Sequence, residues 1–304
     1  MKRKYMIIVL MAGALELTGC SQGTSNSAKN GTTGSENTII SESDIAILDT
    51  EDMFTERDRD TEYDESECTA ISLSDEETKC DSDGVKMDGQ TVTITEGGTY
   101  LLTGSLSNGS VVVDTDKTEK VQLILENVSI INEEGAGICV EQADKVFITL
   151  ADGSTNKIVS NSFTGNEDTN IDGAIFSRED LTLNGSGTLK ITSAAHGIVS
   201  KDDLVLTGGV YQIQSEKQGL SGKESVRIAD GTFTITSGTD AIHSEDTDED
   251  TKGFVYITGG VLTLAAGGDG ISSSYVVQAD GGSFDISTSS TETDTSTKGI
   301  KAQK

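Results

Sequence analysis

Acidic side chains crowd one short loop, and their chemistry points to a hard cation. Residues 244–250 read Ser-Glu-Asp-Thr-Asp-Glu-Asp, which places five carboxylates in six positions. Calcium is bound by several oxygen ligands that converge from one loop, so this composition is typical of a calcium site. The alternate aspartates have the spacing of the first EF-hand ligands, but Thr251 and Ile257 stand where that motif needs glycine and glutamate. The loop is therefore not an EF-hand.

Two interpretations of this acidic loop remain open. The first is a calcium site, to which aspartates of neighbouring repeats would add ligands if the loop folds back. The second, equally supported, is a solvated acidic bulge. The candidate metal ligands are Glu245, Asp246, Asp248, Asp250, Asp240 and Asp269.

A second candidate site places basic residues beside acidic ones. In three successive repeats a basic position is followed by an acidic one, as Arg178-Glu179, Lys201-Asp202 and Lys223-Glu224. A row of cations beside a row of carboxylates could bind a sugar acid. The favoured interpretation is a self-neutralising exposed corner, because exposed ion pairs are individually weak. The candidate carbohydrate-binding residues are Lys201, Asp202, Lys223 and Glu224.

No arrangement in the sequence singles out a catalytic residue. A Gly-x-Ser-x-Gly elbow, a phosphate loop and a clustered His/Cys site are all absent from the sequence. A polysaccharide lyase would use a lysine or arginine to abstract the proton α to a uronate carboxyl group held by calcium, but no pattern identifies that base. His196 and His243 lie at corners without histidine partners, so we interpret them as ordinary polar surface.

A repeat along residues 172–304 must position these side chains. Inside each repeat, two runs of alternating apolar residues are separated by a glycine-containing turn. Such period-2 apolarity, recurring every 20–30 residues or so, is the signature of a stacked solenoid. We predict one three-stranded coil of a parallel β-helix per repeat, with outward loops in the two longest. The repeats begin, at steps of 24, 22, 22, 29 and 29 residues, at Asp172, His196, Gln218, Asp240, Asp269 and Lys298.

Less regular strand signals begin near Thr69, so the predicted all-β domain covers residues 68–304. Cys68 and Cys80 flank a candidate hairpin, where a disulfide and two free thiols are equally consistent with an extracellular protein. Cys139 lies inside an apolar strand and is predicted to be a small buried hydrophobe.

The charge of the chain excludes some classes of partner. Acidic residues number 51 against 22 basic ones, which gives a formal net charge of −29. Such a surface repels DNA, RNA and anionic lipid, and a polyanionic ligand would approach through a bridging metal. We expect no nucleic acid and infer no obligate protein partner.

The N-terminus is typical of a secreted lipoprotein. Residues 1–20 combine a basic start, a short apolar run and the sequence Leu17-Thr18-Gly19-Cys20. Those last four residues resemble the bacterial lipoprotein cleavage box, which implies lipid attachment at Cys20. An ordinary cleaved signal is the alternative. We therefore expect an extracytoplasmic, cell-surface lipoprotein that meets the membrane only through its lipid anchor.

Residues 21–67 read as a linker. Up to residue 43 they contain too few large apolar side chains to fold, which predicts a disordered lipoprotein tether. Residues 44–67 are acidic, and are predicted either to dock across the first coil or to stay solvated.

Several separate motifs resemble one family of proteins. They are Phe54-Thr55-Glu56-Arg57-Asp58, Tyr63-Asp64-Glu65-Ser66-Glu67, Thr91-Val92-Thr93-Ile94, Asp172-Gly173-Ala174-Ile175 and His196-Gly197-Ile198-Val199-Ser200-Lys201-Asp202-Asp203-Leu204. They resemble secreted bacterial carbohydrate-binding-domain proteins, from roughly Phe54 to the end of the chain. The resemblance implies a right-handed parallel β-helix, similar in shape to pectate lyases, that binds plant-type and acidic polysaccharides and holds calcium. The stop just after Gly299-Ile300 departs from the family pattern, so we expect a truncated or split form.

Together these features favour a lipid-anchored, non-catalytic polysaccharide-binding protein supported by calcium. The absence of tryptophan argues against a flat aromatic platform for crystalline cellulose. A pectate-lyase-like enzyme is the runner-up. A structural surface protein or adhesin that binds no glycan is the third hypothesis.

Overall fold

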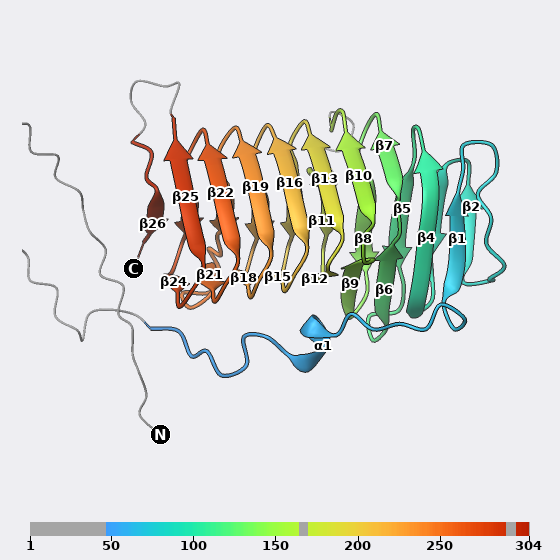
Figure 1. Ribbon diagram of the computed structural model, residues 1–304, viewed down its shortest axis with the longest axis horizontal. Coiled ribbons are helices and arrows are strands. Elements are labelled where there is room, and N and C mark those ends of the chain that lie inside the picture. The colour runs from blue at the N-terminus through green and yellow to red at the C-terminus, as the bar shows by residue number, and fades with distance from the viewer. Residues whose placement is uncertain (1–46, 164–169, 290–295, 304) are drawn as a thin grey trace, which may run out of the picture. The chain divides into compact units, whose positions relative to one another are not determined.

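The computed structural model describes residues 47–163, 170–289 and 296–303. They belong to one compact unit that begins at Ile47. The predicted signal, Cys20 and the whole of the predicted tether lie outside the described residues. The predicted fold is confirmed, because the strands wind into a right-handed parallel β-helix whose coils stack side by side (Figure 1).

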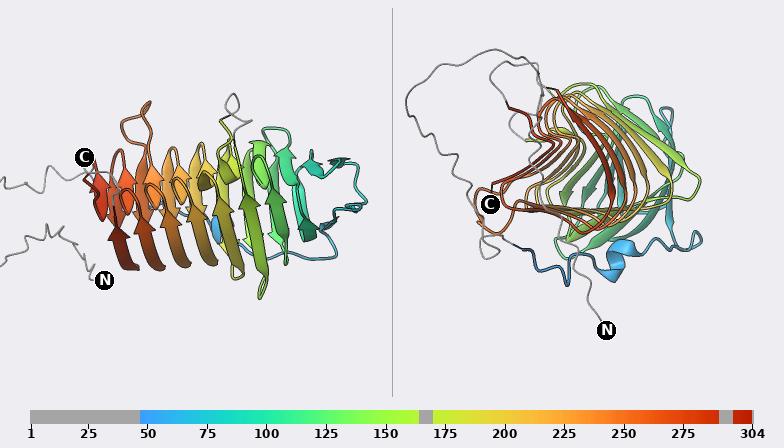
Figure 2. Two further views of the ribbon diagram at one scale, coloured as in Figure 1. Left: turned by 90° about the horizontal axis from the view of Figure 1, so that it is seen from above. Right: turned by 60° about the vertical axis from the view of Figure 1, so that its left-hand side comes forward.

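Each coil contributes to three sheets, here named A, B and C, which enclose the core (Figure 2). Sheet A contains β1 (Thr69–Leu73), β4 (Gly98–Leu106), β6 (Lys120–Leu125), β9 (Lys145–Leu150), β12 (Asp180–Gly185), β15 (Asp203–Leu206), β18 (Ser225–Ile228), β21 (Phe254–Ile257) and β24 (Val277–Ala279). Sheet C contains the end of β4, then β7 (Ser129–Asn132), β10 (Thr155–Ser160), β13 (Thr188–Ser193), β16 (Val210–Ser215), β19 (Thr232–Ser237), β22 (Val261–Ala266) and β25 (Ser283–Thr288). Sheet B contains β2 (Val85–Asp88), β3 (Thr91–Ile94), β5 (Ser110–Asp114), β8 (Ile138–Gln142), β11 (Gly173–Ser177), β14 (His196–Ser200), β17 (Leu220–Gly222), β20 (Ile242–Ser244), β23 (Ile271–Ser273) and β26 (Ile300–Ala302).

Equivalent residues of successive coils form ladders. On sheet C, Tyr211 pairs with Phe233, which pairs with Leu262, and all three side chains are buried. On sheet B, Ile198 pairs with Leu220 in the same way. Because side chains alternate along a strand, every second residue enters the core and the others face outward. The register of these ladders reproduces the predicted repeats.

Strand β4 turns the corner between sheets A and C. Its first half pairs with β6, and its last two residues pair with β7. Gly104 lies at the bend with φ +89°, and a Cβ built there would lie 2.3 Å from the Leu73 carbonyl oxygen. Only glycine fits this close approach of two backbones. At the start of the stack, β2 and β3 pair antiparallel.

The longer repeat after β20 forms an outward loop, as predicted. Residues 245–253 leave the stack and return to begin β21 (Figure 2). They carry the acidic residues of the candidate calcium loop.

A segment before the first strand lies lengthwise along the outer face of sheet A. This segment, residues 47–60, is called the strap. Its contacts with sheet A begin at Leu48, whose N–H donates to the side chain of Gln278 on β24 (3.0 Å). They extend as far as β6, where the Arg57 guanidinium group donates to Gln122 (2.9 Å) and lies over the Phe147 ring of β9. Of the two predicted alternatives, docking and a solvated segment, the strap therefore docks, but it crosses successive coils of sheet A instead of the first coil (Figure 1).

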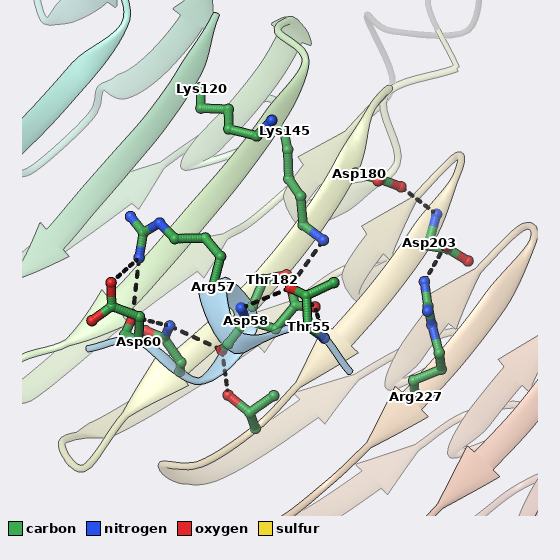
Figure 3. A network of polar contacts seen from close by, with 12 residues as sticks. Thr55, Arg57, Asp58, Asp60, Lys120, Lys145, Asp180, Thr182, Asp203 and Arg227 are labelled. Atoms are coloured by element: carbon green, nitrogen blue, oxygen red, sulfur yellow. Dashed lines mark hydrogen bonds and ion pairs between the residues drawn. The ribbon is translucent and has the colours of Figure 1, made fainter. Parts of the chain in front are cut away.

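A single helical turn secures the strap to the sheet. Helix α1 (Glu56–Arg59) begins with a capping box between Thr55 and Asp58. The Asp58 carboxylate also contacts the Lys145 ammonium group (2.8 Å) and accepts from the Thr182 hydroxyl (2.7 Å), as Figure 3 shows. No helix among the described residues is long and apolar enough to cross a bilayer.

Candidate functional site

A groove on the outer face of sheet B brings several of the candidate residues together. It has a volume of about 260 Å³ and lies over β14, β17 and β20. Its polar lining comes from successive coils, because each coil places the same strand positions one step further along the stack. The side chains with chemistry to offer a ligand are Asp172, His196, Lys201, Lys223, His243 and Glu245.

Both candidate lysines line the groove, and both contact carboxylates. Lys201 lies 3.7 Å from Asp172 Oδ1, and its ammonium group also lies over the Phe176 ring. Lys223 lies 2.8 Å from Asp248 Oδ2, and this hydrogen bond raises the pKa of the Lys223 ammonium group. The lysines are about two-fifths exposed, so a ligand can reach them.

The two histidines also line the groove, which the sequence did not suggest. His196 lies 3.3 Å from Asp172, while its other ring nitrogen accepts the N–H of Gln218 one coil later. His243 stands between Asp240 (3.0 Å) and Glu245 (3.5 Å). The signal was their position in the repeat, since His196 opens β14, the strand that Lys201 follows. His243 lies on β20, one coil after β17, the strand that Lys223 follows.

Asp172 anchors the basic side of the groove. Burial raises the pKa of this carboxyl group, but His196 and Lys201 outweigh burial and lower it. Within the described part of the chain, Oδ1 of Asp172 is buried and accepts no hydrogen bond, and the Lys201 ammonium group lies 3.7 Å from it. Asp172 therefore holds Lys201 and His196 in the lining of the groove.

The two candidate acidic residues of the corner, Asp202 and Glu224, do not line the groove. Burial raises the pKa of Asp202 to about 7, with further contributions from the nearby carboxylates of Asp180, Glu224 and Asp203. Glu224 is also held by Lys252, 2.5 Å away. This arrangement is a cluster of carboxyl groups around the corner from the groove, not a row beside the lysines.

The candidate metal ligands lie in two places, the acidic loop and a corner of the stack, and His243 lies between Glu245 of the loop and Asp240 of the corner. Asp246 is buried, and its Oδ1 accepts the N–H groups of Asp248 and Glu249 (2.7 and 3.0 Å), so it organises the loop. Lys223 contacts Asp248, and Lys252 contacts Glu249. Asp250 has at least one interaction of its own.

Asp240 and Asp269 instead stabilise one corner of the stack. Asp240 accepts the N–H of Asp269 (2.7 Å), and Asp269 accepts the N–H of Lys298 one coil further on (2.7 Å). Burial raises the pKa of Asp240, but hydrogen bonds from His243 and Asp269 lower it overall. Across the described residues, no three His, Cys, Asp or Glu side chains are arranged to hold a metal ion. In this arrangement, lysines and backbone N–H groups satisfy the acidic residues.

The cysteines in the described region have free thiols. Cys68 and Cys80 are partly exposed, and Cys139 is buried on the outer side of sheet B against Phe176. Burial raises the pKa of each of these three thiols above its ordinary value.

Comparison with known proteins identifies the family. A family model described as "Carbohydrate-binding domain-containing protein" matches residues 88–304, which is most of the chain. The chain belongs to this family. A relative in Acetivibrio thermocellus with the same description is 34% identical over 137 residues, which cover 44% of this chain and 48% of the relative. The chain thus spans about half the length of that curated relative.

A solved structure is similar to this carbohydrate-binding domain protein over most of the β-helix. It is the polysaccharide lyase-like protein from C. thermocellum, solved as a gadolinium derivative. The match has a TM-score of 0.72 and 32% identity, and covers 78% of this chain and 94% of that chain. The predicted family resemblance is therefore confirmed.

Proposed function

We propose that this carbohydrate-binding domain protein is an extracellular, lipid-anchored protein that binds an acidic polysaccharide in the sheet B groove without cleaving it. The observation that carries the proposal is the groove itself, because it brings Lys201 and Lys223 together on a strongly acidic molecule. A uronate carboxylate fits there because it can replace Asp248, which is 72% exposed, as the partner of Lys223.

The state of Lys223 favours binding over catalysis. A lysine that abstracts a proton from carbon needs a lowered pKa, so that it is neutral at working pH. The hydrogen bond from Lys223 to Asp248 raises the pKa of Lys223 instead. The name of the polysaccharide lyase-like relative keeps a lyase as the second candidate, with Lys201 or Lys223 as its base.

Calcium support is part of the same proposal. The loop at 245–250 supplies carboxylate oxygens, which calcium prefers, and the related structure was solved as a gadolinium derivative. Calcium binding would require Lys223 and Lys252 to leave the carboxylates that they contact. Calcium should then raise the melting temperature of the wild type, and Asp246→Asn should remove that increase.

A pull-down on polygalacturonate tests the binding proposal. The wild type should be retained. Retention of the Lys201→Ala/Lys223→Ala variant should be at least tenfold lower than that of the wild type. The matched control is Lys79→Ala/Lys86→Ala, which removes the same charge from exposed positions outside the groove. Retention is measured in calcium and in EDTA, with the supernatant read for unsaturated uronide.

Each outcome of the pull-down is informative. Retention without unsaturated product supports a binding protein, and product release makes the protein a lyase. A protein that is not retained in either buffer would be a structural scaffold, which refutes the proposal. The anchor has its own test, because Cys20→Ala should release the protein from cells into the medium.

A further inference from the structure

The three faces of the β-helix differ in what covers them. The strap lies along sheet A, and the charged groove occupies sheet B. Sheet C presents strands β13 to β25 side by side (Figure 1). Its outward residues on these strands are called the sheet C face.

The sheet C face is regular. Strands β13, β16, β19, β22 and β25 pair in one unbroken register, so each outward position lies in a straight ladder with its equivalents. Neighbouring rungs lie roughly 4.8 Å apart. The three ladders are Thr188, Val210, Thr232, Val261 and Ser283; Lys190, Gln212, Thr234, Thr263 and Asp285; and Thr192, Gln214, Thr236, Ala265 and Ser287.

This face is almost uncharged on a molecule whose net charge is −29. Lys190 and Asp285 are its charged members, and they lie on its first and last strands. The centre of the face is made of threonine, glutamine and valine. Charge therefore neither attracts nor repels a ligand there, in contrast to the groove on sheet B.

Polar side chains on the central strands of the sheet C face are available to a ligand. Within the described residues, the side chains of Gln212, Gln214, Thr234 and Thr263 are exposed and form no hydrogen bond with another protein group. The hydroxyl and amide groups of such residues can both donate and accept. Val261 is 51% exposed and adds an apolar surface beside them. The face thus offers hydrogen bonds and apolar contact, once per coil, at one spacing.

We propose that the sheet C face binds a long, uncharged polysaccharide chain, separately from the acidic ligand of the groove. The occupant follows from this chemistry. Sugar hydroxyl groups both donate and accept, the C–H faces of pyranose rings are apolar, and an extended glycan repeats along its length, as the ladders do along the stack. The proposal rests on the carbohydrate-binding function of the family, but it does not depend on the groove.

Repetition makes a specific prediction about chain length. Each coil contributes weak contacts without an aromatic platform, so a short oligosaccharide should bind poorly. A longer chain engages several coils at once and gains affinity through effective concentration. Retention should therefore increase with the length of the glycan until the chain spans the face.

The experiment is affinity electrophoresis of the full chain in gels that contain glucomannan or polygalacturonate. Gln212→Glu/Thr234→Asp places two negative charges at the centre of the face. We expect the affinity of this variant for glucomannan to be at least tenfold lower than that of the wild type. Its retardation by polygalacturonate should be unchanged. The matched control, Ser72→Asp/Met87→Asp, adds the same charge at exposed positions of β1 and β2 and should behave as wild type.

The outcomes separate this proposal from the proposed function. If glucomannan does not retard the wild type while polygalacturonate does, the sheet C proposal is wrong and the groove survives. Loss of glucomannan binding in Lys201→Ala/Lys223→Ala would also overturn the proposal, because it would place both ligands in the groove. If neither glycan retards the wild type, both proposals fail.

Discussion

The strap is predicted to depend on one buried carboxylate, Asp58. Its side chain is only 2% exposed, and its partner Lys145 is 14% exposed. Burial alone would raise the pKa of Asp58, but hydrogen bonds from Lys145 and Thr182, together with those from Thr55, lower it from 3.8 to about 2. This lowering of the pKa corresponds to about 2 kcal/mol in favour of the ionised, docked state.

Asp58→Asn should therefore weaken docking of the strap by about 2 kcal/mol or more, because it also leaves the Lys145 ammonium group without its partner. The assay uses trypsin, since Arg57 and Arg59 lie within the strap. When the strap opens and closes faster than trypsin cuts, the cleavage rate follows the population of the open strap. A loss of about 2 kcal/mol of docking free energy therefore predicts roughly 30-fold faster cleavage.

The control for this experiment is Asp60→Asn. Asp60 forms an ion pair with Arg57 at 3.4 Å, but its side chain is 47% exposed, so its loss should cost less than about 1 kcal/mol. Equal cleavage rates for the Asp58 and Asp60 variants would refute the assignment of Asp58 as the main contact of the strap.

The same carboxylate fixes the pH dependence of docking. The pKa of Asp58 is lower in the folded state, so its contribution is complete above pH 3.8 and is lost as the pH falls through about 2. Hydrogen exchange of the strap at pH 5 and at pH 2.5, corrected for intrinsic rates, should show protection falling at the lower pH. A strap that exchanges equally slowly at both values would contradict this prediction.

Three further experiments test other parts of the fold. Tyr211→Phe should raise the free energy of unfolding by about 1 kcal/mol, because the buried hydroxyl group has no partner among the described residues. Tyr100→Phe should lower the free energy of unfolding, since the Tyr100 hydroxyl group donates a hydrogen bond to the Glu96 carbonyl group. Urea titration of the two variants measures both changes. The pKa of Asp202 is raised from 3.8 to about 7, so its contribution to stability is lost as the pH rises from 3.8 to about 7. Asp202→Asn should therefore raise the melting temperature most at pH 8, less at pH 5 and not below pH 3.8, and no gain at pH 8 would contradict this. Gly104→Ala should destabilise by more than 2 kcal/mol in chemical denaturation, while Gly89→Ala, which also has positive φ but open space, should cost about 1 kcal/mol.

The ladders could be predicted from the sequence because they follow from a local rule. Alternation of apolar residues fixes which side chains face inward, and recurrence of glycine fixes the length of a coil. Pairing such as that of Ile198 with Leu220 then follows by counting along the chain. The positions of Lys201 and Lys223 at equivalent corners were predictable for the same reason.

Neither the path of the strap nor the contacts of the acidic loop could be predicted by this rule. Asp58 contacts Thr182, 124 residues away, through an irregular segment with no period to count. The loop aspartates read as calcium ligands because the sequence shows carboxylates but not which cations face them. In the structure Lys252 returns within the same loop to meet Glu249, and Lys223 reaches in from the previous coil.

The strap changes how the stack is expected to unfold. In a solenoid each coil contacts only its neighbours, so the terminal coils can open at little cost to the rest. The strap links coils that are not neighbours, because it bonds Gln278 on β24 at one end and Gln122 on β6 at the other. Between them it covers Thr182 and Asn184, polar residues on the outward side of β12 that are fully buried and hydrogen-bonded to Asp58. Opening of an end coil must therefore also break strap contacts, which makes the described coils more cooperative than their nearest-neighbour pairing alone would allow.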